Sequence, residues 1–236
     1  MKKFKFSDLI TKDSAKINKN LKKGHLTGVM YLSPANESDH QMCFDHTVGC
    51  ETLCLGCTSG KMRFESAKNA RINRTDLFFE DRDAFLELMD KELASIQRRA
   101  EKHGFKPSFR PNGCSDWPWE NDALHLMQKY DFPWYDYTKS FTRMGRYLDG
   151  KMPENYHLLF SMSEDEKNQG HCGEVLRRGG NVAVVFFAVI IGGNLGCQKV
   201  AGPSATSQSP ESLSAEASPP QQGTDNSALT VAEKTE

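Results

Sequence analysis

Apolar residues recur at helical spacing in one long segment of the chain, residues 81–103. The stripe places its members three or four positions apart, at Phe85, Leu88, Met89, Leu93, Ile96 and Ala100. This period predicts an amphipathic helix with one face in a core. Asp81 is a suitable cap for its start, and Gly104 is a suitable stop after the basic residues Lys102 and His103.

Short apolar runs between glycines, prolines and polar residues predict strands over residues 27–33, 106–110, 134–137 and 155–160. Helix-forming residues cover 61–73, 120–130 and 164–178. The last apolar run, residues 181–191, has no polar face, which predicts a strand in the middle of a sheet covered on both sides. Strands and helices in alternation indicate an α/β fold, either a partial (β/α) barrel or an open parallel sheet.

Composition divides the 236 residues into three parts. Residues 1–23 form a basic N-terminal segment, and residues 24–200 form the α/β domain. Residues 201–236 are rich in Ser, Ala, Pro, Gln and Thr and contain no aromatic residue, which predicts a disordered tail.

Net charge and hydrophobicity limit the classes of binding partner that the sequence predicts. The formal net charge of -1 provides no global basic field for nucleic acid. The apolar run 182–191 has about half the length that spans a bilayer, so no membrane partner is expected. We expect a cytoplasmic protein, in which clustered cysteines stay reduced and favour metal over disulfides.

The candidate chemistry concentrates in four cysteines within fifteen residues, Cys43, Cys50, Cys54 and Cys57, of which the last three have the spacing C-x3-C-x2-C. Thiolates this close can converge on zinc or an iron–sulfur cluster, and three of them leave a fourth coordination position open. The alternative is that several are small buried side chains. His40 or His46 could complete a Cys3His zinc site. The remaining cysteines, Cys114, Cys172 and Cys197, stand alone and are interpreted as buried hydrophobic residues.

A second group of candidates follows the strand predicted over residues 106–110. Asn112, Ser115 and Asp116 are candidate contacts to a cofactor or substrate, and Arg110 is a candidate for facing an anion. The alternative is structural, because Ser115 or Asp116 could cap the next helix.

Two further candidates end the strand predicted over residues 134–137. Tyr137 and Lys139 are polar groups suited to acid–base catalysis. Alternation places both on one face of the strand and Asp136 on the other. The alternative for this pair is a structural role.

Several ordered motifs resemble an uncharacterised family of phage and bacterial mobile-element proteins similar to the gene-product-88 type. They lie between residues 19 and 186 and include Gly49-Cys50-x3-Cys54-Leu55, Arg110-x-Asn112-Gly113-x-Ser115-Asp116, Asp136-Tyr137-Thr138-Lys139 and Asn155-Tyr156-His157. The resemblance implies no established activity. It also implies a threonine where Cys114 stands and no cysteine matching Cys57, which would leave Cys43, Cys50 and Cys54 as the ligands.

The C-x3-C-x2-C loop is also distantly similar to that of radical S-adenosylmethionine enzymes, in which it follows the first strand of a partial barrel. That similarity implies a [4Fe–4S] cluster on Cys50, Cys54 and Cys57 that binds S-adenosylmethionine. Gly56 departs from the aromatic residue usual there. Two other interpretations stay open: a zinc-stabilised nucleic-acid or protein-binding module without catalysis, and a metal-free protein that acts by partner contacts. If the chain is phage-encoded, its place is the host cytoplasm.

Overall fold

The computed structural model describes residues 4, 6–35, 37–184, 189–191 and 194–196. The chain separates into two units, Met1–Phe186 and Phe187–Glu236. The segment predicted as a disordered tail, residues 201–236, and Cys197 lie outside the described residues.

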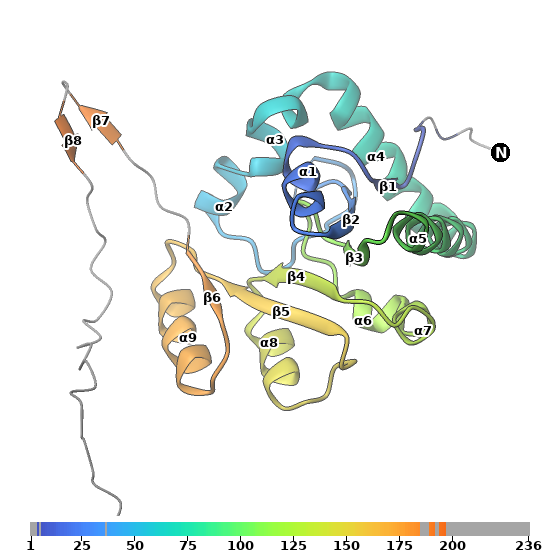
Figure 1. Cartoon of the computed structure of the whole chain (residues 1–236). Coiled ribbons are helices and arrows are strands. Elements are labelled where there is room, and N and C mark those ends of the chain that lie inside the picture. The colour runs from blue at the N-terminus through green and yellow to red at the C-terminus, as the bar shows by residue number, and fades with distance from the viewer. Residues whose placement is uncertain (1–3, 5, 36, 185–188, 192–193, 197–236) are drawn as a thin grey trace, which may run out of the picture. The chain divides into compact units, whose positions relative to one another are not determined.

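One six-stranded sheet forms the centre of the first unit. Its strands, in chain order and in spatial order, are β1 (Ile10–Thr11), β2 (His25–Met30), β3 (Lys106–Arg110), β4 (Trp134–Thr138), β5 (Tyr156–Ser161) and β6 (Val182–Ala183). Strand β1 runs antiparallel to β2, and all other pairs are parallel. The structure therefore confirms the α/β class with a mostly parallel sheet (Figure 1). The consecutive order is that of a singly wound sheet, in which right-handed crossovers place the connecting helices on one face.

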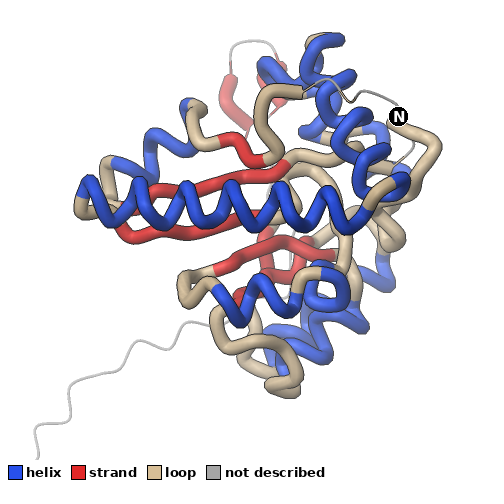
Figure 2. The backbone as a smooth tube through the Cα atoms, turned by 90° about the vertical axis from the view of Figure 1, so that its right-hand side faces the viewer, coloured by secondary structure: helices blue, strands red, loops and turns tan. Residues whose placement is uncertain are grey.

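The helices of this unit are α1 (Ala15–Leu21), α2 (Val48–Thr52), α3 (Leu55–Thr58), the 3-10 turn η1 (Gly60–Arg63), α4 (Glu65–Glu80), α5 (Arg82–His103), α6 (Trp119–Asp122), α7 (Leu124–Lys129), α8 (Phe141–Leu148) and α9 (Glu166–Arg177). Helix α5 packs on β2 and β3, α8 on β4 and β5, and α9 on β5 and β6. Figure 2 shows the long helix α5 lying along the strands.

Helix α5 confirms the helix predicted over residues 81–103. Asp81 accepts a hydrogen bond from the backbone N–H of Ala84 at 3.0 Å, and Gly104 ends the helix with a φ of 68°. Every predicted stripe residue except Leu88 is fully buried. Strand β3 also has the predicted bounds.

The sequence predictions and the structure differ in two helical regions in particular. The helix predicted over residues 120–130 is two short helices, α6 and α7, which meet at Ala123. Helix α8 was not predicted, because its inward face carries Arg143 and so reads as polar.

The strand predicted over residues 181–191 is confirmed only at Val182–Ala183, its central position in the sheet is not, and residues 185–188 lie outside the described residues. Among the described residues only Val182–Ala183 pair with the sheet, β6 stands last in its order, and Val184 is 44 % exposed. In the second unit, β7 (Val189–Ile191) pairs antiparallel with β8 (Asn194–Gly196). Hydrophobicity alone does not specify which neighbour a strand pairs with.

The two faces of the sheet differ in character. On β4, Trp134, Asp136 and Thr138 are buried on the face that carries α8, whereas Tyr135 and Tyr137 are half-buried on the opposite face. The parallel register places Arg110, Tyr135 and Tyr137 on this second face, together with Thr27, Ser108, Leu159 and Ser161. We call it the far face.

The N-terminal segment packs into the unit through a buried carboxylate. Glu92 of α5 accepts hydrogen bonds from the backbone N–H groups of Leu9 at 2.7 Å and Ile10 at 2.9 Å. Lys12 lies 3.4 Å from the same carboxylate. Leu9 and Ile10 are fully buried beside it, so this carboxylate fixes the edge strand β1.

We expect Glu92→Ala to lower the free energy of unfolding by about 2–3 kcal/mol, because two buried backbone donors lose a charged acceptor. Urea unfolding measures the change. The matched control is Glu87→Ala on the same helix, whose exposed pair with Lys91 contributes less than about 0.5 kcal/mol. Equal losses in the two variants would show that the Glu92 carboxylate does not hold β1.

Candidate functional site

The loops that leave β2 and β3 meet at the carboxyl edge of the sheet. Residues 31–64, here called the cysteine loop, follow β2 and precede α4. The backbone N–H of Gly113 donates to the carbonyl of Met30 at 2.8 Å, and that of Asp116 donates to the carbonyl of Met42 at 2.9 Å. These bonds fix the start of the cysteine loop against the loop that follows β3.

The predicted thiol ligands are distributed along the cysteine loop. Cys43 is buried, Cys50 lies in α2, and Cys54 and Cys57 lie in one helical turn, because the backbone N–H of Cys57 donates to the carbonyl of Cys54 at 2.9 Å. All cysteines of the described residues are free thiols. Within those residues, no three His, Cys, Asp or Glu side chains already form a metal-ligand arrangement. The ligand set Cys43, Cys50, Cys54 and Cys57 stays a prediction.

The isolated position of Cys114 in the sequence predicts a cysteine without cysteine neighbours. In the structure, Cys114 lies close to the cysteine loop. A Cβ placed on Gly56 would lie 3.0 Å from the sulfur of Cys114 and 3.5 Å from the sulfur of Cys54. The same Cβ would lie 2.5 Å from the Cβ of Cys114, so only glycine allows this approach. The signal in the sequence was the position of Cys114 after β3, since loops at the ends of adjacent parallel strands are neighbours.

Burial favours the protonated form of three thiols. It raises the pKa of Cys43 and of Cys57 to about 12, and that of Cys114 well above its usual value. Arg71 acts in the opposite direction on Cys57 and Cys114, because its positive charge favours the thiolate. Arg71 is itself buried and pairs with Glu37, with Nε at 2.7 Å from a carboxylate oxygen.

The histidines considered for a Cys3His site have other contacts. His40 stacks on Phe79 with 4.0 Å between ring centroids. One ring nitrogen of His46 lies 2.7 Å from the carbonyl of Cys43, and the other lies 3.4 Å from Glu51.

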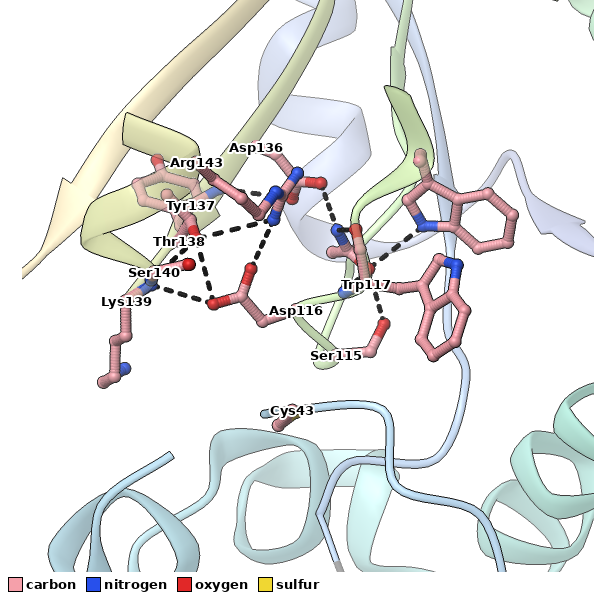
Figure 3. Close-up of polar contacts among 12 residues, drawn as sticks. Cys43, Ser115, Asp116, Trp117, Asp136, Tyr137, Thr138, Lys139, Ser140 and Arg143 are labelled. Carbon is pink, nitrogen blue, oxygen red and sulfur yellow. Dashed lines mark hydrogen bonds and ion pairs between the residues drawn. The ribbon is translucent and has the colours of Figure 1, made fainter. Parts of the chain in front are cut away.

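Asn112 is the centre of the hydrogen bonds in the loop that follows β3. Figure 3 shows Ser115, Asp116 and Trp117 of this loop. Its side-chain oxygen accepts from Ser115 Oγ at 2.8 Å and from Trp117 N at 3.0 Å. Its amide nitrogen donates to the carbonyl of Trp117 at 2.9 Å and to the carboxyl group of Asp136. Asn112 and Ser115 thus shape this loop from inside, and their predicted contact with a cofactor stays a prediction.

Asp116 connects the same loop to β4 and α8. One of its oxygens accepts from Arg143 at 2.6 Å, and the other accepts from Thr138 Oγ1 at 3.1 Å and from the backbone N–H of Lys139 at 2.8 Å. Burial raises the pKa of Asp116, and the charge of Arg143 opposes that rise. Its predicted cofactor contact also remains untested.

Sequence reasoning missed the buried charges beneath this loop. Arg143 donates to both oxygens of Glu120, at 3.0 and 2.9 Å, and to Tyr156 Oη at 2.9 Å. Asp136, fully buried, accepts from Tyr156 Oη at 3.2 Å, and burial raises its pKa to about 8. The available signal was strand alternation, which makes Asp136 and not Tyr137 the inward residue of β4.

Arg110, Tyr137 and Lys139 occupy more open positions. Arg110 Nε donates to the carbonyl of Asn112 at 3.0 Å, and its guanidinium lies 4.7 Å from the ring centroid of Tyr137. The Lys139 side chain points away from the buried network and its Nζ lies 3.5 Å from Ser161 Oγ. These three side chains are accessible to a ligand in a way that the buried Asn112 is not, and their functional roles stay predictions.

A carboxylate from the loop after β5 holds the middle of the cysteine loop. Glu164 accepts from Thr47 Oγ1 at 2.9 Å and from the backbone N–H of Gly49 at 2.7 Å. Beside it is a pocket of about 320 Å³ lined by Asp45, Thr47, Lys139, Phe141, Thr142, Asp165, Lys167, Asn168 and His171. The loops after β2, β3, β4 and β5 therefore contribute to one polar region.

We expect Asp136→Asn to stabilise the protein increasingly as the pH rises from about 4 to about 8. The folded pKa of Asp136 is raised from 3.8 to about 8, so folding must retain a proton that the unfolded chain releases in this window. Each unit of that difference corresponds to about 1.4 kcal/mol. The wild-type protein should lose stability relative to the variant across the window, as measured by thermal melting in steps of pH.

The matched control for this series is Asp131→Asn, since Asp131 is exposed just before the same strand. Its melting temperature should follow that of the wild-type protein at every pH. A constant difference between wild type and Asp136→Asn from pH 4 to pH 8 would contradict a raised pKa.

No helix among the described residues is both long and apolar enough to cross a bilayer. No curated protein and no solved structure matches the chain. The model of a protein family described as gene product 88 matches residues 8–228. The cysteine loop, the strand-end loops and the sheet that supports them all lie within the matched residues, and the chain therefore belongs to the gene product 88 family.

Proposed function

We propose that this protein is an enzyme whose reaction centre is a [4Fe–4S] cluster bound by Cys50, Cys54 and Cys57. The observation that carries the proposal is the position of the cysteine loop. It follows β2, the first strand of the parallel series, and is bonded to the loop that follows β3. Reaction centres of parallel α/β folds lie at this edge.

The donor set is suited to a cluster. Cys54 and Cys57 share one helical turn. Arg71 favours the thiolate of Cys57, whereas burial, Cys54 and Glu37 oppose it, so cluster iron would have to supply most of the positive charge. Cys50, Cys54 and Cys57 are only partly buried. The Cys57 thiol donates to Glu37 Oε1 at 3.6 Å, and binding a cluster would replace this bond. Binding would release the protons that burial now retains on Cys57.

Three protein thiolates leave one iron for a small molecule, and S-adenosylmethionine is the cofactor that we propose there. Such a cluster supplies one-electron chemistry when bound. Arg110 and Lys139 are the side chains of this chain best placed to contact the cofactor or substrate, and Tyr137 and Lys139 are its candidate proton carriers. Asn112, Ser115 and Asp116 would support the cofactor by fixing the loop after β3.

The test is purification without oxygen, followed by measurement of iron, acid-labile sulfide, zinc and the visible absorption spectrum. We expect iron and sulfide in equal amounts, a broad absorption band, and a spectral change when S-adenosylmethionine is added. Cys50→Ser, Cys54→Ser and Cys57→Ser should each lose most of the iron. The matched control is Cys172→Ser, because Cys172 is a buried cysteine of α9 that bonds Asn168.

Two outcomes contradict the proposal. Stoichiometric zinc without iron would favour a zinc-stabilised binding module, and a folded, metal-free protein would exclude both metal centres. Cys43→Ser and Cys114→Ser complete the series, because loss of iron in either, with Cys57→Ser unaffected, would move the third ligand away from Cys57.

A further inference from the structure

We propose that Arg110 and Tyr137 form a subsite on the far face of the sheet for the oxyanion of a small molecule that also carries a flat ring. This subsite would bind the substrate of the proposed enzyme. It rests on the proposed function only in placing the reacting atoms at the cysteine loop. The shared chemistry is a carboxylate or phosphate beside a planar group.

The first argument is the bonding of the inward arginines. Arg71 pairs with Glu37, Arg143 pairs with Glu120 and Asp116, and Arg74 donates to the carbonyl of Asp8 at 2.9 and 2.7 Å. Arg71 and Arg143 thus have carboxylate partners, and Arg74 uses two of its nitrogens on one carbonyl. Arg110 has neither arrangement: among the described residues no carboxylate forms an ion pair with it, and only its Nε donates a hydrogen bond.

The unused donors of Arg110 lie on its terminal nitrogens. A guanidinium has five N–H groups, and Arg110 uses its Nε–H for the carbonyl of Asn112. No described residue accepts from its two Nη groups, although the side chain is only partly exposed. Two parallel N–H groups in a fixed plane match the two oxygens of a carboxylate or phosphate.

One aromatic ring lies against this guanidinium, and the charge of the guanidinium acts on two further phenols. Its carbon lies 4.7 Å from the ring centroid of Tyr137, and Tyr31 and Tyr135 are close enough for its charge to lower their pKa values against the rise from burial. The net rise keeps both phenols neutral, so they do not neutralise Arg110. A flat ring attached to the anion would find aromatic faces within reach.

The subsite also borders the thiols. Tyr31 follows β2 directly, and its ring would lie 2.4 Å from a Cβ on Gly113, so the ring packs on the backbone of the loop that contains Cys114. A ligand held by Arg110 would therefore lie next to the cysteine loop, as a substrate of the proposed centre must.

The experiment is calorimetric titration of the full chain with adenosine monophosphate, benzoate, inorganic phosphate and adenosine. Adenosine monophosphate combines a phosphate with a flat ring, benzoate combines a carboxylate with one, and the other two probes carry one feature each. We expect one of the combined probes to bind more tightly than phosphate or adenosine. Which one binds identifies the anion as phosphate or carboxylate.

The variants assign binding to Arg110. Arg110→Met should weaken the combined probe by about tenfold or more and leave adenosine unchanged, and Arg110→Lys should restore binding in part, since lysine keeps the charge but not the fork. The control is Arg99→Met on the exposed side of α5. Melting temperatures equal to that of the wild-type protein would show that all three variants fold.

The proposal is overturned if no combined probe binds the wild-type protein, or if Arg110→Met binds as Arg99→Met does. Iron and sulfide content measured on the same samples separates this result from the proposed function. Iron retained with no dependence on Arg110 would refute the subsite alone. Binding that depends on Arg110 in a protein without iron would refute the cluster alone.

Discussion

The guanidinium of Arg143 is the interaction on which the edge of the sheet depends. From α8 it reaches Asp116 in the loop after β3, Glu120 in α6 and Tyr156 in β5. Replacing one buried partner in such a network leaves an unpaired charge, which costs about 3–5 kcal/mol. Much of the attraction among these buried charges is cancelled by the free energy needed to remove them from water. The network therefore contributes more to the positions of the loops than to the free energy of folding.

The position of the cysteine loop follows from this network through the backbone. Asp116 is oriented by Arg143 and Thr138, and its N–H bonds the carbonyl of Met42, next to Cys43. Glu164 holds the other side through Gly49. A loop held at both sides can place thiols reproducibly although its helices, α2 and α3, are only five and four residues long.

The sequence predicted those parts of the fold in which local pattern and tertiary environment agree. Helix α5 has a clear apolar stripe and caps at both ends, and β3 is bounded by glycine and proline. Helix α8 was not predicted because its buried face includes Arg143. An arginine is buried there only because carboxylates distant in sequence, Asp116 and Glu120, pair with it.

The site was predictable in composition but less so in arrangement. The cysteine loop and the loop after β3 were identified from their residues. The approach of Cys114 to Cys54 depends on a glycine between them and on strand adjacency, which spacing along the chain does not encode. Asp136 was passed over for Tyr137, although one step along a strand exchanges a buried position for an open one.

That single step along β4 also links the two faces of the sheet. Arg110 lies on the far face, yet its charge helps to lower the pKa of Asp136 on the other face. Any event that neutralises Arg110 would let the Asp136 pKa rise further and favour proton uptake in the buried network. By thermodynamic reciprocity, protonation of Asp136 would then favour an anion at Arg110. Anion binding at the partly exposed Arg110 would thus be coupled electrostatically, across the sheet, to protonation of the buried Asp136.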